Sequence, residues 1–272
     1  MKKILILFLI GLMTISVFGC GKKEKTEENT PFEDRAVTLS DRALDSIIRT
    51  ILEKEAGDTI MLSELLEVTE IRNPEGAWGI ESLKDLEMFA NLKVLRLDEV
   101  EIDSLEPIKG LTALEEISFY GSRINDVSAL AELVNLKQLW LDQNMIENID
   151  SFSKLVNLET LWLEGNRIKD ISSLGKMEKL QYLSLNDNLV EDISALEDLT
   201  ALIRLDLRNN LIKDISSLKN KTNLTLLNLY GNAIEDVSPL KDLKNLELLL
   251  IGNNPVDDFS SLNQLLETDI KY

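Results

Sequence analysis

The stretch 155-LVNLETLWLEGNRIKDISSLGK-176 decides the fold of this chain, because its 22-residue pattern recurs eight times between Phe89 and Gln264. The fourth position of every unit is leucine, the seventh and ninth form an apolar pair such as Leu161 and Leu163, and the twelfth is asparagine in the last six units. A fixed period of this length predicts a stack of similar coils. The units start at Phe89, Leu111, Leu133, Leu155, Met177, Leu199, Lys221 and Leu243, and Lys221 alone breaks the apolar pattern.

The periods inside one unit predict its local structure. The alternation in 161–163 predicts a short strand whose two leucines point inward. Asn166 lies where the strand must turn, and its amide is expected to satisfy backbone groups left unpaired there. Stacked from unit to unit, these amides are expected to form a ladder. The sequence Asp170-Ile171-Ser172 predicts the start of a 3₁₀ turn on the back of the coil. We therefore expect an α/β right-handed solenoid, with a parallel β-sheet on its concave face and 3₁₀ turns on its convex face.

Both ends of such a stack need protection from water. Leu39-Ser40-Asp41 predicts the start of a helix capped by Ser40, with apolar residues at helical spacing and a stop near Gly57. Residues 37–88 are thus expected to form a helical N-terminal cap and a degenerate first repeat, and 89–264 the eight repeats. At the other end, residues 265–272 form a short C-terminal cap in which Leu265, Leu266 and Ile270 shield the last coil.

The N-terminus carries an export signal. Met-Lys-Lys is followed by an apolar run from Ile4 to Phe18, which is short for a membrane span. Val17-Phe18-Gly19-Cys20 resembles the lipobox of bacterial lipoproteins, which implies that residues 1–19 are removed and Cys20 is acylated. Residues 20–36 are charged and polar, and they are expected to form a disordered tether. These features predict an exported protein that is held at the cell membrane or cell surface by its lipid.

Composition excludes several classes of function. The net charge of −19 repels phosphate backbones and disfavours a nucleic-acid partner. The chain has no histidine, which is the commonest general base and metal ligand, and its single cysteine permits neither an intrachain disulfide nor a thiolate zinc site. We therefore expect no metal, no cofactor and no catalytic residues.

The repeat resembles the 22-residue leucine-rich repeats of bacterial internalin-like proteins from about Val37 to Gln264. The residues that carry the resemblance are Leu-x-x-Leu-x-x-Leu-x-Leu-x-x-Asn-x-Ile-x-Asp-Ile-Ser-x-Leu and the cap from Val37-Thr38-Leu39-Ser40-Asp41 to Val68-Thr69-Glu70-Ile71. The resemblance implies extracellular recognition of a protein partner through the concave face. The sequence shows neither an immunoglobulin-like stretch after the repeats nor a sortase-type C-terminal anchor, so fold and mode of binding carry over and host invasion does not.

The outward positions of the predicted strands give the candidate binding surface. Trp140 and Trp162 occupy the same position in adjacent strands, about 4.8 Å apart. Exposed aromatic clusters of this kind are typical of interface hot spots, although a cross-strand pair can also simply stabilise the sheet. Asp142 and Glu164 favour a ligand with basic groups, and Arg204 and Arg208 can bind a carboxylate. The expected ligand-binding residues are Tyr120, Trp140, Asp142, Trp162, Glu164, Tyr182, Arg204, Arg208 and Tyr230.

Two other functions suit the same surface. A glycan-binding lipoprotein is the alternative to a protein-binding module, because a tryptophan pair beside carboxylates also fits sugar rings. A glycosidase that uses Asp142 and Glu164 has the required residue types. However, a shallow open face excludes water poorly and offers no reason for a raised carboxyl pKa, so we expect no enzyme.

Overall fold

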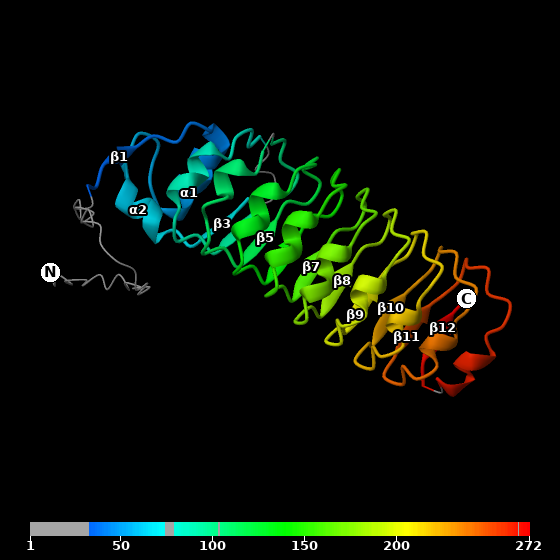
Figure 1. Ribbon diagram of the computed structural model, residues 1–272. Coiled ribbons are helices and arrows are strands. Elements are labelled where there is room, and N and C mark those ends of the chain that lie inside the picture. The colour runs from blue at the N-terminus through cyan, green and yellow to red at the C-terminus, as the bar shows by residue number, and fades with distance from the viewer. Residues whose placement is uncertain (1–32, 74–78, 103, 266) are drawn as a thin grey trace, which may run out of the picture. The chain divides into compact units, whose positions relative to one another are not determined.

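The computed structural model describes residues 33–73, 79–102, 104–265 and 267–272. Within it, residues 34–272 form one body, a curved stack of coils (Figure 1). The signal peptide, Cys20 and most of the tether lie outside the described residues, as does Leu266. In the described part of the chain, no helix is both long enough and apolar enough to cross a membrane.

One parallel sheet of ten strands runs the length of the body, in the order β3 to β12. Each pair of neighbouring strands within the repeats is offset by one 22-residue unit, so that Leu139 pairs with Leu161 and Trp140 with Trp162. The register therefore confirms the repeat predicted from the sequence. The strands are β3 (Glu70–Arg72), β4 (Val94–Arg96), β5 (Glu116–Ser118), β6 (Gln138–Trp140), β7 (Thr160–Trp162), β8 (Tyr182–Ser184), β9 (Arg204–Asp206), β10 (Leu226–Asn228), β11 (Leu248–Leu250) and β12 (Asp269–Lys271).

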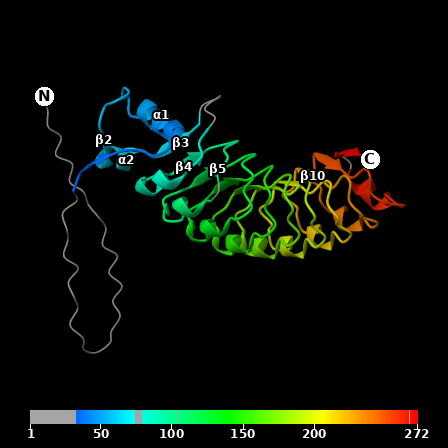
Figure 2. The same cartoon turned by 90° about the horizontal axis from the view of Figure 1, so that it is seen from above.

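Short 3₁₀ helices cover the opposite side of the stack. Figure 2 shows them along the outer, convex edge of the arc, with the strands on its inner side. The Asp-Ile-Ser prediction is confirmed, because Asp170 Oδ1 accepts a hydrogen bond of 2.8 Å from the Ser172 N–H, where η5 begins. The 3₁₀ helices are η1 (Lys84–Met88), η2 (Glu106–Ile108), η3 (Ser128–Glu132), η4 (Asp150–Lys154), η5 (Ser172–Lys176), η6 (Ser194–Leu196), η7 (Ser216–Leu218), η8 (Ser238–Leu240) and η9 (Ser260–Gln264).

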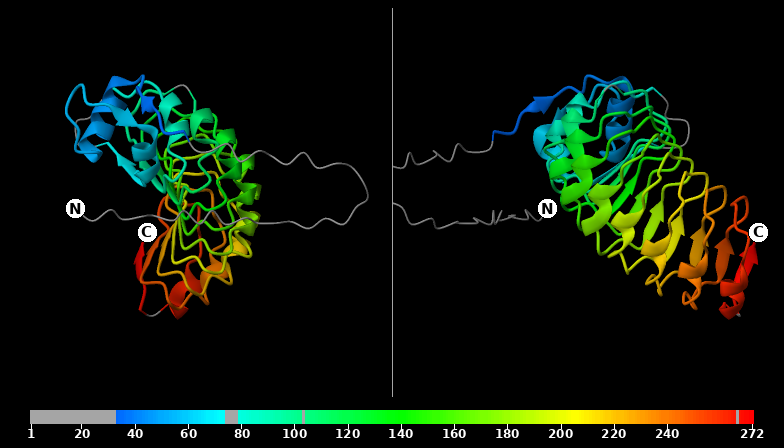
Figure 3. Two further views of the ribbon diagram at one scale, coloured as in Figure 1. Left: turned by 90° about the vertical axis from the view of Figure 1, so that its left-hand side faces the viewer. Right: turned by 45° about the vertical axis from the view of Figure 1, so that its right-hand side comes forward.

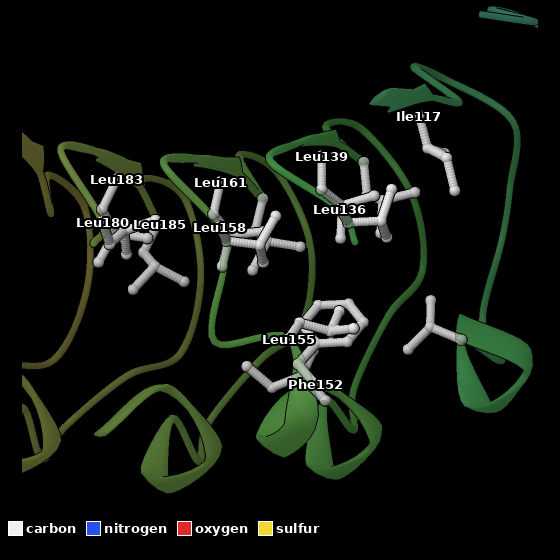
Figure 4. Close-up of a cluster of buried hydrophobic side chains, with 14 of the residues drawn as sticks. Ile117, Leu136, Leu139, Phe152, Leu155, Leu158, Leu161, Leu180, Leu183 and Leu185 are labelled. Atoms are coloured by element: carbon white, nitrogen blue, oxygen red, sulfur yellow. The ribbon is translucent and has the colours of Figure 1, made fainter. Parts of the chain in front are cut away.

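The core lies between the sheet and the 3₁₀ helices and runs without a break through the stack. In Figure 4, Leu139 and Leu161 point from neighbouring strands into this space, and Phe152 fills it from the convex side. All three side chains are fully buried. One coil exposes its leucines on two sides, and only the coils before and after it remove them from water, so the stability of the stack is shared between neighbours.

The turn asparagines satisfy backbone groups, as expected, but their amides do not form a ladder with one another. The Asn188 amide nitrogen donates to the carbonyl oxygens of Leu163, Leu185 and Asn186 at 2.9, 3.0 and 3.3 Å, and its Oδ1 accepts from the Ile168 N–H at 2.9 Å. Each amide therefore ties its own strand end to the backbone of the preceding coil rather than to the next amide. Buried backbone groups left unpaired at the turn are satisfied in this way.

A left-handed residue precedes each of these turns, a feature that the sequence reading missed. The eleventh position of all eight repeats has φ between 52° and 69°. Gly165 adopts this conformation at no steric cost and Asn209 tolerates it, whereas Gln143 bears a penalty for its Cβ. The residues are Glu99, Gly121, Gln143, Gly165, Asp187, Asn209, Gly231 and Asn253.

The N-terminal cap contains more structure than we predicted. Two helices, α1 (Arg42–Ile51) and α2 (Leu62–Glu67), accompany an antiparallel pair of strands, β1 (Ala36–Val37) and β2 (Ile60–Met61). Ala36 was expected in the tether, but it begins β1. The helix α1 ends at Ile51, well before Gly57.

The residue that caps α1 is Asp41, so the prediction of Ser40 is wrong. Asp41 Oδ1 accepts from the Leu44 N–H at 2.9 Å, and its Oδ2 accepts from the N–H groups of Glu81 and Ser82 at 2.8 and 3.1 Å. A carboxylate has room for several donors, whereas the hydroxyl of Ser40 instead donates outside the helix. One side chain thus caps the helix and ties it to the first coil.

The C-terminal cap includes a strand that the sequence reading did not predict. β12 pairs with β11 in parallel, and Ile270 packs half-buried against the core. Behind it, the rings of Phe259 and Tyr272 meet edge to face with centroids 4.8 Å apart. Leu265 is buried, as expected. The last coil is therefore covered by one strand and one aromatic contact.

Candidate functional site

The exposed face of the sheet presents its side chains in three parallel rows. In each strand of the repeats the middle residue is buried in the core and its neighbours face outward, and the register aligns these neighbours along the stack. Figure 3 shows the strands side by side along the stack. The central row is Arg96, Ser118, Trp140, Trp162, Ser184, Asp206, Asn228 and Leu250. The leading row is Val94, Glu116, Gln138, Thr160, Tyr182, Arg204, Leu226 and Leu248. The trailing row is Asp98, Tyr120, Asp142, Glu164, Asn186, Arg208, Tyr230 and Gly252.

The two tryptophans meet, but they are not equivalent. Their ring centroids are 6.5 Å apart and their planes are at 84°. Trp162 is 45% exposed, whereas Trp140 is half-buried, with the Arg96 guanidinium 4.6 Å from the centroid of its ring. Arg96 is held there by an ion pair with Glu116. A cation of the protein thus already covers Trp140, and Trp162 is the more accessible ring.

The two carboxylates beside the tryptophans also differ. Asp142 is only 6% exposed, and its Oδ1 accepts from the Glu164 N–H at 2.8 Å. The pKa of Asp142 is raised to about 6, mainly by burial; the nearby charges of Glu164 and Asp98 contribute to the rise, and the hydrogen bond from the Glu164 N–H opposes it. The expectation that this open face gives no reason for a raised carboxyl pKa is therefore wrong. Side chains such as Trp162 and Tyr120 stand exposed on this face, whereas the Asp142 side chain is buried in the floor of the face, where water is excluded.

Glu164 follows the next strand, β7, at the position that matches Asp142, is partly exposed, and is loosely held. Its Oε1 is 3.5 Å from Gln143 Nε2 and 3.6 Å from Arg208 Nη2, and both distances are long for hydrogen bonds. Arg208 Nη2 is also 3.9 Å from Asp187 Oδ2, and the Arg208 Nε is buried without a partner among the described residues. Arg208 is therefore shared between two carboxylates rather than paired with either.

The remaining predicted residues lie on the exposed face around the central row. Tyr120 and Tyr230 lie in the trailing row and Tyr182 in the leading row, and all three side chains are exposed. Arg204 is exposed next to Tyr182 in the leading row. The fold thus brings all nine predicted residues to one face, although Asp142 lies in its floor.

Three leucines on the same face were not among the predicted site residues. Leu226 and Leu248 are paired neighbours in the leading row, and Leu250 ends the central row beside Asn228. All three are half-buried and point away from the core, because they occupy the sixth and eighth positions of their units. The sequence carried a signal for them, since these two positions are otherwise mostly polar.

Among the described residues, no group of three or more Cys, Asp or Glu side chains is arranged to hold a metal ion. Of the two carboxylates that follow the tryptophan strands, Asp142 is the one whose pKa is raised, to about 6. This surface presents aromatic, acidic and aliphatic side chains over several strands.

A curved parallel sheet with 22-residue coils and an asparagine at each turn defines a leucine-rich-repeat solenoid. The family model described as "Leucine Rich repeats (2 copies)" matches residues 134–176, 178–220 and 222–264. An internalin (inlF) from Listeria monocytogenes is 30% identical in a match that covers 85% of this chain and 74% of the internalin, with a TM-score of 0.74. Internalin C2 from the same species is 33% identical, covering 77% and 92% of the two chains, with a TM-score of 0.74.

The chain therefore belongs to the internalin-like leucine-rich-repeat proteins of bacteria. The comparison with curated protein sequences found no match. The leucine-rich-repeat ectodomain of an Arabidopsis thaliana membrane receptor kinase, solved in complex with CASPARIAN STRIP INTEGRITY FACTOR 2, shares the fold with a TM-score of 0.59 at 23% identity, over 70% of this chain and 27% of the receptor chain. Leucine-rich-repeat proteins of these kinds are protein-interaction modules.

Proposed function

We propose that this protein binds a protein partner through the exposed face of its sheet. The observation that carries the proposal is Trp162, which stands 45% exposed in the middle of the face with Tyr120 and Tyr182 exposed on either side of the central row. Exposed aromatic side chains bury a large apolar area when a partner covers them, and they therefore contribute strongly to the binding free energy at interface hot spots. The partner presents basic groups to Asp142 and Glu164. Arg204 and Arg208 bind a carboxylate of the partner.

We further propose that the protein acts outside the cytoplasm, anchored by a lipid on Cys20. The support is the apolar run before the single cysteine of the sequence and the membership of the internalin-like family. Two acyl chains hold a protein on a membrane durably, whereas one chain binds only marginally. The substitution Cys20→Ser is expected to move the protein from the membrane fraction to the medium, and unchanged partition would refute the anchor.

The binding proposal is tested by crosslinking on intact cells. The variant Trp140→Ala/Trp162→Ala is expected to lose the crosslinked partner that the parent protein captures. A matched control is Val156→Ala, which removes an exposed apolar side chain outside the strands. If the double variant captures the same partner as efficiently as the parent, the sheet face is not the binding surface.

A glycan ligand is the second candidate, and one observation favours it. Trp162 presents an open ring beside the partly exposed carboxylate of Glu164, and sugar rings stack on such surfaces. A glycan array probed with the parent and with Trp162→Ala separates the two functions. Binding that depends on Trp162 supports the glycan function, and an array without signal leaves the protein partner.

A further inference from the structure

The face contains one complete cation-binding arrangement and one that lacks its cation. At the complete one, Arg96 stacks on Trp140 and pairs with Glu116 from the adjacent strand. One strand along, Trp162 lies next to the carboxylate of Glu164, and no cation covers its ring among the described residues. An exposed indole with a carboxylate beside it attracts a guanidinium or ammonium group through both the ring and the charge.

The carboxylates around Trp162 are short of positive charge. Arg208 is the cation nearest to Glu164 and lies 3.6 Å away, too far for a hydrogen bond, while it also faces Asp187. Asp142 is buried after β6 and Asp206 is half-buried on β9, and burial raises the pKa of both. Glu164, which is partly exposed and poorly compensated, is therefore the carboxylate that is complementary to a basic group from outside.

A second contact site lies further along the same face. Leu226, Leu248 and Leu250 form an aliphatic cluster on β10 and β11, with the exposed Tyr230 beside it. These three leucines occupy outward positions of their strands, so they do not belong to the core. The hydrophobic core of this chain therefore does not explain why these positions are apolar. Such a cluster fits an apolar side chain of a partner.

The residues between the two sites are short and polar. Along the central row, Trp162 is followed by Ser184, Asp206 and Asn228 before Leu250 is reached. Each oxygen of Asp206 accepts one hydrogen bond, from the Arg208 N–H and from the Asn228 amide, and keeps a further lone pair. An extended polypeptide needs such partners for its backbone, whereas a helix satisfies its own backbone.

Geometry sets the spacing of the two anchors. Trp162 and Leu250 are four strands apart, which is about 19 Å at the usual strand separation. An extended chain covers this distance in about six residues, and an even number places both side chains on the same face. Resting on the proposed function, we infer that the partner presents an extended segment along the central row, with an arginine or lysine on Trp162 and Glu164 and an apolar residue about six positions away on the leucine cluster.

The test uses a display library of random linear peptides, panned on the purified full chain. We expect enrichment of peptides with a basic residue separated by about six positions from Leu, Ile, Phe or Trp. Trp162→Ala and Leu250→Ala are each expected to weaken a selected peptide at least about tenfold. Val156→Ala is the matched control with an exposed apolar residue outside the face, and thermal melting checks that each variant is folded.

A scan of the selected peptide assigns the two ends. In the Trp162→Ala background, replacing the peptide's basic residue is expected to weaken binding less than in the parent, because only Glu164 remains to bind it, while replacing its apolar residue weakens binding as much as in the parent. The Leu250→Ala background is expected to show the reverse. Selected peptides that depend on Trp162 but carry no basic residue, or no second anchor at this spacing, overturn this inference and leave the sheet face as the binding surface. If panning enriches no peptide, the inference of an extended segment is overturned, and the sheet face remains the proposed binding surface. Peptides unaffected by either substitution overturn the inference and contradict the proposed binding surface as well.

Discussion

The two ends of the solenoid are closed by different means. The N-terminal end is covered by α1, α2 and a strand pair, and two buried carboxylates fasten this cap to the first coil. Asp41 binds the backbone of Glu81 and Ser82, and Asp85 accepts bonds from Ser40 in return. The C-terminal end is covered by the three residues of β12 and the contact of Tyr272 with Phe259. The difference indicates that hydrogen bonds to a folded cap hold the first coil in place, whereas the last coil is shielded from water by one short strand and one aromatic contact.

The largest expected effect comes from unfastening the N-terminal cap. Asp41→Ala removes the helix cap and leaves the N–H groups of Glu81 and Ser82 without their acceptor, so the free energy of unfolding is expected to fall by about 2–3 kcal/mol. Chemical denaturation measures the loss. Asp45→Ala is the matched control, because that carboxylate is more exposed and its partner is Arg49 in the same helix. Equal effects of the two substitutions would show that Asp41 does not lock the cap.

Removing the C-terminal layer is expected to have a smaller and more local effect. Deletion of residues 268–272 takes away β12 and exposes β11, at a cost of about 1–2 kcal/mol for the lost apolar and aromatic contacts. Hydrogen exchange is expected to quicken at Leu248–Leu250 and to stay unchanged at β4. Loss of protection through the whole stack would mean that this end is as firmly coupled as the other.

The interior of the stack is expected to respond to pH through Asp142. Its folded pKa of about 6 lies above its ordinary value of 3.8, so the folded state binds the proton more tightly. The stabilisation of the folded state that comes from protonating Asp142 is therefore fully present below about pH 4 and is lost as the pH rises through about 6. Asp142→Asn is expected to raise the free energy of unfolding by about 1 kcal/mol near neutral pH, after allowance for solvent screening, and to change little near pH 4. Thermal melting across this range measures it, and an equal gain at both pH values would contradict the shift.

The smallest expected effect is at Lys221, the one polar residue in an apolar position of the repeats. Its side chain is buried, its Nζ donates to the Glu197 carbonyl at 2.6 Å, and burial lowers its pKa. Lys221→Leu restores the pattern and is expected to stabilise the protein by about 0.5–1 kcal/mol, because solvent can satisfy the exposed Glu197 carbonyl. Calorimetry compares it with Lys219→Leu, an exposed neighbour that should give no gain. A loss of stability at Lys221 would assign the ammonium group a structural role.

Much of the fold could be predicted because the same pattern of apolar positions and turn residues occurs in eight consecutive repeats. The inward leucines, the turn asparagines and the Asp-x-Ser starts of the 3₁₀ helices all occupy their predicted places. The cap was predicted less well, because it occurs once and depends on contacts between residues far apart in the sequence. Nothing local distinguishes Ser40 from Asp41 as the helix cap, since the choice depends on where Glu81 and Asp85 lie.

The candidate site divides in the same manner. Alternation along each strand predicted which residues share the outer face, including Trp140, Trp162 and the three tyrosines. It could not predict that Arg96, two coils before Trp140, reaches over the Trp140 ring and leaves Trp162 open. It also could not predict the burial of Asp142, because exposure on a curved sheet depends on the neighbouring large side chains.

The sequence by itself determined the architecture of this protein: leucines at a fixed interval can leave water only if the chain coils and stacks, so period alone selects the sheet, its register and its outward rows. Only the tertiary structure decided how the ends are closed, which tryptophan is free and which carboxylate holds its proton. Those properties depend on distances between side chains from different coils, and electrostatic and aromatic interactions change steeply over the few ångströms that a repeat pattern leaves unspecified.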